Sequence, residues 1–267
     1  MKIISLLYHD VIPPGNADSS GFPGADASVY KLDVSEFRRH LNAIHSVTPQ
    51  CFSIRDALDG RRGGLLLTFD DGGVSAHQYI ADLLEEVGWR GHFFITTDWI
   101  GKHGFLDAAQ IRDLHRRGHD IGSHSRSHPE RMSYCSRGKL MREWSESVAA
   151  LTEILGERIA IASVPGGYYG KHVAEAAAAS GIRVLFTSEP ETSSCSVNGC
   201  RVLGRYTIRQ GVRASTAAAI ACGKRLPRYR QYAYWNLKKA MKLTAGTHWL
   251  HARRRILATR AVVRSKK

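Results

Sequence analysis

The sequence predicts an α/β fold with a mostly parallel sheet. Strand-like apolar runs alternate with amphipathic helical segments through most of the chain, and this alternation is typical of parallel strands joined by crossover helices. One apolar run, residues 64–69, begins at a glycine and ends in two adjacent carboxylates, as expected of a buried strand whose carboxyl end faces a ligand. The length of 267 residues suits one large α/β domain or barrel with an appendage.

The predicted elements follow one another in a regular order. Strands are expected at Ile3–Leu7, Gly64–Phe69, His92–Thr96, Asp120–Gly122, Ile159–Val164, Arg183–Thr187 and Val202–Arg209. Helices are expected at Val34–Val47, Ser75–Val87, Ala108–Arg117, Ser136–Leu155 and Lys171–Ser180. The first helix places Phe37, Leu41 and Ile44 on one face, and Gly118 and Gly156 are suited to end two of the others.

The positive charge of the chain is concentrated at its C-terminal end. Residues 224–267 hold 14 Lys and Arg and no acidic residue, whereas residues 1–223 hold 24 basic and 24 acidic residues. We therefore divide the chain into a main α/β domain, residues 1–223, and a basic tail, residues 224–267. Two helices are expected in the tail, Gln231–Leu243 and Thr247–Val263.

Both tail helices interleave aromatic and aliphatic residues with Lys and Arg. This pattern is typical of helices that contact an anionic membrane surface. The alternative is a helical extension that packs its apolar face on the main domain and leaves its charges in solvent. Nucleic-acid binding is not expected, because the sequence contains no recognised nucleic-acid-binding module.

Several features predict a cytoplasmic protein, and the basic tail would add peripheral contact at the inner membrane face. The first residues lack the long apolar segment and small-residue cleavage site of a secretion signal, and no run is long enough to span a membrane. Five scattered cysteines suit a reducing compartment better than a disulfide framework. Cys195 and Cys200 flank a predicted hairpin turn at Asn198-Gly199, where free thiols are expected.

Two clusters of metal-binding residue types follow predicted strands. Asp70 and Asp71 end the first, and the glycines after them allow a sharp turn that could bring both acids into one site. His124 and His128 follow the second; on a helical turn they would lie on one face and could bind one metal ion. One carboxylate and two imidazoles would leave coordination positions open, as in catalytic metal sites.

The sequences TFDDG (residues 68–72) and HSRSH (residues 124–128) resemble the motifs of the metal-dependent polysaccharide deacetylases, the NodB-homology group or carbohydrate esterase family 4. The resemblance covers about residues 3–223, implies a distorted, incomplete (β/α) barrel, and extends to the YHDV opening of exopolysaccharide-associated members. It implies Asp70 as general base and Asp71, His124 and His128 as ligands of a divalent metal. A metal-bound water would then be the nucleophile that removes N-acetyl groups from amino sugars of a polysaccharide or lipid-linked glycan. This ligand set suits Zn²⁺, with Co²⁺ or Ni²⁺ as alternatives.

A third family motif is only partly present, in residues 163–168. Pro165 and Gly167 match the family pattern, but Ser163 stands where relatives have an arginine that holds the base carboxylate. The resemblance implies that the amide of Gly166 stabilises the oxyanion. Pro165, Gly167 and Tyr168 are expected to contact the sugar, with simple packing of the tyrosine as the alternative.

Two functional groups of the family have no direct counterpart. Arg205 could replace the missing arginine from another strand, although it could also be a surface residue. The usual general-acid histidine is absent, which leaves His9 or a metal-bound water. His9 and Asp10 follow the first strand, where they could face the site or anchor the long loop up to Tyr30.

Three readings of the function remain open from the sequence. The first is a metal-dependent N-deacetylase acting on N-acetylated amino sugars. The second is a non-catalytic, metal-containing glycan-binding relative, which the missing arginine and histidine favour and the intact Asp70 disfavours. The third is an amidase on a small non-sugar substrate, with the loop between Asp10 and Tyr30 as a lid. A glycosidase is set aside, because adjacent acids on one strand end are too constrained to flank a sugar.

Overall fold

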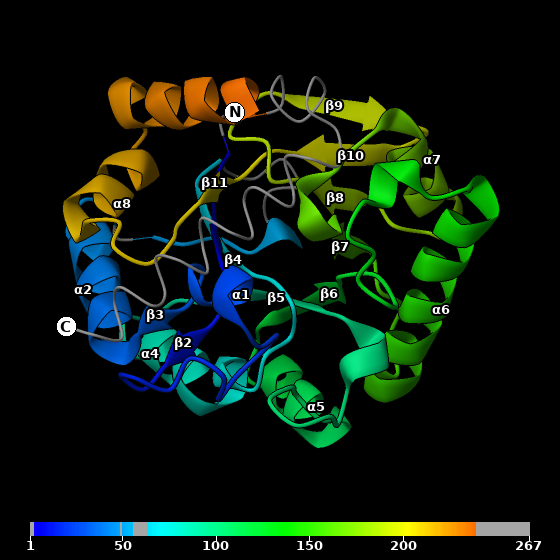
Figure 1. The fold of residues 1–267 in the computed structure, drawn as a ribbon, viewed down its shortest axis with the longest axis horizontal. Coiled ribbons are helices and arrows are strands. Elements are labelled where there is room, and N and C mark those ends of the chain that lie inside the picture. The colour runs from blue at the N-terminus through cyan, green and yellow to red at the C-terminus, as the bar shows by residue number, and fades with distance from the viewer. Residues whose placement is uncertain (1–2, 49, 56–62, 239–267) are drawn as a thin grey trace.

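The structure is a computed structural model that describes residues 3–48, 50–55 and 63–238. Within these residues, nine strands form one curled sheet in the order β11-β1-β4-β5-β6-β7-β8-β10-β9. All paired neighbours are parallel except β9 and β10. The edge strands β11 and β9 do not pair with each other, so the sheet is an open barrel with helices on its outer face (Figure 1). The predicted α/β class and incomplete barrel are confirmed.

The elements have the following bounds. The strands of this sheet are β1 (Ile4–Tyr8), β4 (Leu65–Phe69), β5 (His92–Ile95), β6 (Asp120–Ser123), β7 (Ile161–Ser163), β8 (Val184–Phe186), β9 (Ser194–Val197), β10 (Cys200–Leu203) and β11 (Tyr206–Thr207). The short strands β2 (Val11–Ile12) and β3 (Leu32–Asp33) pair separately. The helices are α1 (Ala25–Ser28), α2 (Val34–His45), α4 (Ala81–Glu86), α5 (Ala108–Arg116), α6 (Arg137–Leu155), α7 (Lys171–Ala179) and α8 (Ala214–Ala221). Residues 225–238 are also helical.

Most predicted elements are present, with ends shifted by a few residues. The Asn198-Gly199 turn joins β9 to β10, and both residues have positive φ (49° and 82°), as a tight hairpin requires. The five cysteines are free, as expected. The predicted strand Val202–Arg209 is wrong in one respect, because it is two strands, β10 and β11, that belong to different parts of the sheet. The sequence reasoning missed α8, whose alanine-rich sequence has little polar face and packs against α2.

Side chains of β4 alternate between the two faces of the sheet. Leu65, Leu67 and Phe69 belong to the large core between the sheet and the helices, which also contains residues of α2, α4 and α5. Leu66 belongs to a separate cluster with Phe94 of β5, together with residues of β7 and β8. The period of two therefore directs even-numbered residues of β4 into the barrel, and Asp70 continues this series directly after the strand.

The described part of the basic tail is a helix that bridges the open barrel. This helix begins at residue 225, earlier than the predicted start at Gln231, and is described to residue 238. Gln231 donates to the carbonyl of Thr207 on β11 at 2.7 Å, and Trp235 lies against Gly167, which follows β7. The predicted helix Thr247–Val263 lies outside the described residues. Within the part of the chain that the structure describes, no helix is long and apolar enough to span a membrane.

Candidate active site

The two acids after β4 lie in one site because the backbone turns sharply between them. Asp71 has φ of 75° and Gly72 has φ of 82°, a left-handed conformation that costs little for glycine but is uncommon for aspartate. In an extended strand the side chain of Asp71 would point away from that of Asp70. The turn brings both toward His124, whose Nε2 lies 3.4 Å from Asp71 Oδ1 and 4.0 Å from Asp70 Oδ2.

Asp70 is held by Arg205 in a buried, bidentate ion pair. The Nη1 and Nη2 atoms of Arg205 donate to Oδ1 and Oδ2 of Asp70, each at 2.7 Å, and the arginine side chain is 0% exposed. Burial would raise the pKa of Asp70, but the charges of Arg205 and His124 outweigh it and hold that pKa below its ordinary value. The carboxylate is thus ionised and fixed in orientation.

Arg205 reaches this position because the chain crosses the barrel. It lies between β10, which pairs with β8, and β11, which pairs with β1 at the other edge of the sheet. Its Nε donates to the carbonyl of Thr187 at 2.9 Å, and its Nη1 to Thr68 Oγ1 at 3.2 Å. The rings of Phe94 and Phe186 lie beneath the guanidinium, 5.6 and 5.8 Å from its central carbon. Arg205 is therefore an interior residue and not the surface arginine that the sequence left open.

Asp71, His124 and His128 form a possible metal site. One ligand atom from each residue lies within 4.8 Å of the other two, and His128 Nε2 is 3.5 Å from Asp71 Oδ1. Burial would raise the pKa of Asp71, but hydrogen bonds from His124 and His128 hold it well below its ordinary value. One carboxylate and two imidazoles fit a divalent transition metal with open coordination positions.

The two histidines lie on a loop after β6 and not on a helical turn, so that expectation is wrong. Ser125 and His128 have positive φ (64° and 59°), which breaks helical geometry. The loop is held by Glu143 of α6, whose carboxylate accepts from the Ser127 amide at 2.8 Å and from its hydroxyl at 2.6 Å. The histidines converge through a tied loop conformation, which their spacing alone does not predict.

Ser163, at the position of the missing arginine, links His124 to Asp70. His124 Nδ1 lies 2.6 Å from Ser163 Oγ and 3.1 Å from its carbonyl oxygen. Because a carbonyl can only accept, this geometry places a hydrogen on Nδ1, so that Nε2 is the ring nitrogen directed toward Asp71 and available to a metal. Ser163 Oγ in turn donates to Asp70 Oδ1 at 3.0 Å. Sequence reasoning noted Ser163 only as a departure from the family pattern and missed this positioning role.

His9 lies beside the two acids, and Asp10 turns the other way. The half-buried ring of His9 packs on Tyr30, with centroids 4.7 Å apart, and its buried Nδ1 has no hydrogen-bond partner among the described residues. Burial lowers the pKa of His9 more than the nearby Asp71 and Asp70 raise it. His9 is thus the residue of the YHDV segment that faces the site.

Asp10 anchors the long loop after β2. Its Oδ1 accepts from Ser20 Oγ at 2.6 Å and from Ser75 Oγ at 2.8 Å. A Cβ on Gly73 would lie 2.0 Å from the same oxygen, so only glycine at this position leaves room for the carboxylate. The sequence allowed His9 and Asp10 either to face the site or to anchor the loop. In the structure His9 faces the site and Asp10 anchors the loop.

Lys31 completes the attachment of this loop. Its buried ammonium group donates to the carbonyls of Ala17, Ser20 and Phe22 at 2.6–2.7 Å. The ring of Phe22 then packs on His128, with centroids 4.8 Å apart. The loop consequently supports one of the candidate metal ligands from outside the barrel.

The segment after β7 is shaped by close contacts with its own chain. Gly166 and Gly167 have φ of 64° and 69°, and Pro165 is buried. A Cβ on Gly166 would lie 2.6 Å from the Glu130 carbonyl, and a Cβ on Gly167 would lie 2.9 Å from the Trp235 ring. Gly167, which was expected to contact the sugar, thus lies next to Trp235. Sequence reasoning did not connect Trp235 to the site.

Tyr168 stands at the rim of the same segment. Its half-buried ring makes an edge contact with Tyr134, with centroids 6.3 Å apart. The guanidinium of Arg131 lies 5.7 Å from the Tyr168 ring centroid. The tyrosine therefore has structural neighbours at this rim, and its contact with a sugar stays a prediction.

Comparison with known proteins agrees with this fold. The polysaccharide deacetylase family model matches residues 58–185. YxkH of Bacillus subtilis, provisionally named a polysaccharide deacetylase, is 24% identical over 225 residues, which are 82% of this chain and 75% of YxkH. This chain combines an α/β barrel with a cluster of Asp and His that could hold a metal ion at the carboxyl ends of its strands. The chain belongs to the polysaccharide deacetylase family.

Solved structures share the fold. The Streptococcus pyogenes deacetylase PplD, in complex with acetate, superposes with a TM-score of 0.69 and 18% identity, covering 83% of this chain and 98% of PplD. IcaB from Ammonifex degensii gives a TM-score of 0.66 and 20% identity, covering 84% of this chain and 97% of IcaB. At these identities the likeness establishes the barrel architecture.

Proposed function

We propose that this protein is a metal-dependent hydrolase that removes N-acetyl groups from amino sugars of a polysaccharide or lipid-linked glycan in exopolysaccharide or envelope assembly. The observation that carries the proposal is the Asp70–Arg205 pair beside the Asp71, His124 and His128 cluster. A protein that only bound a metal and a glycan would have no use for a second, separately oriented carboxylate. The pair thus favours the enzyme over the non-catalytic reading.

Each residue of the site would then have a defined task. Asp71, His124 and His128 would hold the divalent metal, with Zn²⁺ the best match and Co²⁺ or Ni²⁺ as alternatives. A metal bound there supplies Lewis acidity toward water and the acetamide carbonyl. Asp70 would accept the proton of the attacking water, and its alignment by Arg205 would keep it ionised for that task. The amide of Gly166 would donate to the oxygen that becomes negative in the transition state.

The proposal is tested by acetate release from short N-acetylglucosamine oligomers and from a lipid-linked N-acetylated sugar. We expect release by the metal-loaded full-length protein, loss of release after chelation, and recovery when Zn²⁺ is restored. Release that persists in the chelated protein would contradict metal dependence. Absence of release from every N-acetylated sugar, with metal bound in a 1:1 ratio, would contradict the N-deacetylase itself.

We further propose that His9 donates the proton to the departing amine. His9→Asn should lower amide hydrolysis by about a hundredfold, at the lower end of the usual range for acid catalysis, because solvent reaches the half-buried ring and can replace it in part. Hydrolysis of an aryl acetate, whose leaving group needs no proton, should change far less. Equal losses on the amide and on the aryl ester would instead assign His9 a structural role.

The location at the inner membrane face is also a proposal, supported by the helix of residues 225–238. Leu226, Tyr229 and Leu237 of this helix are 61%, 68% and 59% exposed, next to basic residues that would favour anionic lipid. We expect the protein to cosediment with phosphatidylglycerol vesicles, and replacement of these three residues by serine to weaken binding by about tenfold or more.

The matched control for vesicle binding is Tyr134→Ser, which removes a 68% exposed aromatic residue from the barrel rim. It should bind vesicles as the wild type does. Binding that is equally weakened by the control, or that is absent in the wild type, would contradict the membrane proposal and leave the site chemistry unaffected.

A further inference from the structure

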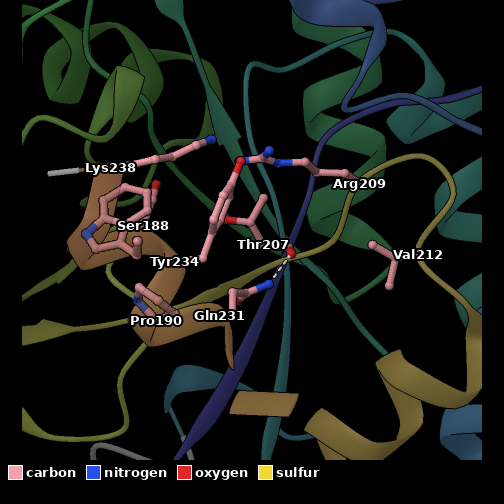
Figure 2. A pocket seen from close by; sticks show the side chains of 9 residues that line it. Ser188, Pro190, Thr207, Arg209, Val212, Gln231, Tyr234 and Lys238 are labelled. Atoms are coloured by element: carbon pink, nitrogen blue, oxygen red, sulfur yellow. Dashed lines mark hydrogen bonds between the residues drawn. The ribbon is translucent and has the colours of Figure 1, made fainter. Parts of the chain in front are cut away.

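A cavity of about 190 Å³ is lined in part by the helix of residues 225–238, and Figure 2 shows the side chains around it. One wall comes from Ser188, which follows β8, and another from Thr207 and Arg209, at and after the end of β11. The helix contributes Tyr234 and Lys238. This volume is below the roughly 300–1,000 Å³ of clefts that hold a drug-sized ligand, so the cavity suits one charged group or one sugar ring.

The charge in this cavity is positive. Arg209 and Lys238 both line it, and no carboxylate is among the described residues that do. Figure 2 shows the ends of both side chains converging near the Tyr234 hydroxyl, and these cations lower the pKa of Tyr234 despite its partial burial.

Aromatic rings hold the two cations in place. The guanidinium carbon of Arg209 lies 5.1 Å from the Tyr30 ring centroid, and Lys238 Nζ lies 4.5 Å from that of Tyr234. A cation placed over an aromatic face keeps its N–H groups available for a ligand. The two cations are therefore oriented by rings and by the Tyr234 hydroxyl, and their remaining N–H donors are available to an anion.

The cavity is connected to the candidate active site on two sides. Tyr30, which supports Arg209, also packs on His9. On the other side, Trp235 lines the cavity and lies against Gly167, next to the proposed oxyanion donor. Gln231, tied to Thr207, fixes the helix between these two contacts. A substrate with its acetamide at the metal site would thus bring a neighbouring group toward the cavity.

We propose that this cavity is an anion subsite, which binds a phosphate or carboxylate group of the glycan next to the sugar that is deacetylated. This inference rests on the proposed deacetylase function and narrows its substrate to an anionic glycan or a glycosyl phosphate. It also gives the described part of the basic tail a role in substrate binding. The cationic groups that recognise the anion come from both the barrel and the tail helix.

The test compares kcat/KM for three matched N-acetylated disaccharides: one neutral, one with a phosphate monoester and one with a uronic acid carboxylate. We expect the full-length protein to prefer one or both anionic substrates by about tenfold or more. The double variant Arg209→Gln/Lys238→Gln should lose this preference. Lys238→Gln alone, at the end of the described helix, should lose part of it. The substrate that is preferred distinguishes phosphate from carboxylate as the source of the charge.

The control is Arg213→Gln/Arg230→Gln, which removes the same charge from two exposed residues that do not line the cavity. It should retain the preference. Three results would overturn the subsite: equal rates on all substrates, an unchanged preference in the double variant, or an equal loss in the control, which would indicate general electrostatic attraction.

Direct binding separates this inference from the proposed function. Calorimetric titration of the full-length protein with N-acetylglucosamine 1-phosphate and with N-acetylglucosamine needs no turnover. Tighter binding of the phosphate that Arg209→Gln/Lys238→Gln abolishes would support the subsite even if no substrate were deacetylated. Equal affinity for the two sugars would overturn it, whether or not the protein is active.

Discussion

Replacement of Asp70 by asparagine is expected to lower the rate of acetate release by about 10²–10⁴-fold, the usual contribution of a positioned base. Asparagine keeps the size of the side chain but cannot accept the proton of the attacking water. The candidate metal ligands Asp71, His124 and His128 are untouched, so bound metal should be unchanged. The measurement is kcat on N-acetylglucosamine oligomers, together with metal content.

Asp107→Asn is a suitable control for this substitution. Asp107 is exposed at the start of α5, where its carboxylate accepts from the Gln110 amide at 2.8 Å, and asparagine caps helices about as well. Its activity should equal that of the wild type. Near-normal activity of Asp70→Asn would show that another group takes the proton, whereas lost metal would make Asp70 a ligand and not a base.

Replacement of Arg205 by methionine is expected to lower the free energy of unfolding by about 3–5 kcal/mol, because it leaves the buried Asp70 carboxylate without its partner. The rate of acetate release should fall as well, since no other described residue donates to both carboxylate oxygens. Arg205→Lys should recover little of the lost stability or activity, because an ammonium group cannot form the two parallel hydrogen bonds to the carboxylate. Urea unfolding measures the first effect and oligomer deacetylation the second.

The double variant Arg205→Met/Asp70→Asn distinguishes a true pair from two independent contributions. Its loss of stability should be clearly smaller than the sum of the two single losses, since no unpaired buried charge remains. Arg201→Met, on neighbouring β10 and only half-buried, should have a small effect. Additive losses in the double variant would contradict the ion pair as the source of the stability.

Local patterns predicted most of the fold. The apolar runs and the period of the helices located the parallel strands and the helices α2, α5, α6 and α7 within a few residues, because burial of one face imposes a regular repeat. The pattern failed where burial is continuous or the element is short. Helix α8 has almost no polar face, and β2 and β3 have two residues each.

The candidate site was predictable only in part. Asp70 and Asp71 could be placed together, because a strand end followed by two glycines constrains the local backbone. The spacing of His124 and His128 suggested a shared metal, but the structure brings them together on a loop with two positive φ angles. Glu143 and Lys31, which hold the loops that carry or support these ligands, left no signal near the motifs.

The sequence by itself determined the α/β class, the strand end that carries the acids and the resemblance to the polysaccharide deacetylases, since all of these depend on residues close together in the chain. The tertiary structure alone decided that Arg205 pairs with Asp70 and does not lie at the surface, that His9 faces the site while Asp10 holds the loop, and that Trp235 lies beside Gly167. Each of these contacts joins segments that are distant in the sequence and come together only when the barrel curls and the chain crosses it. Hydrophobic periodicity specifies which face of an element is buried, but not which distant segment covers it.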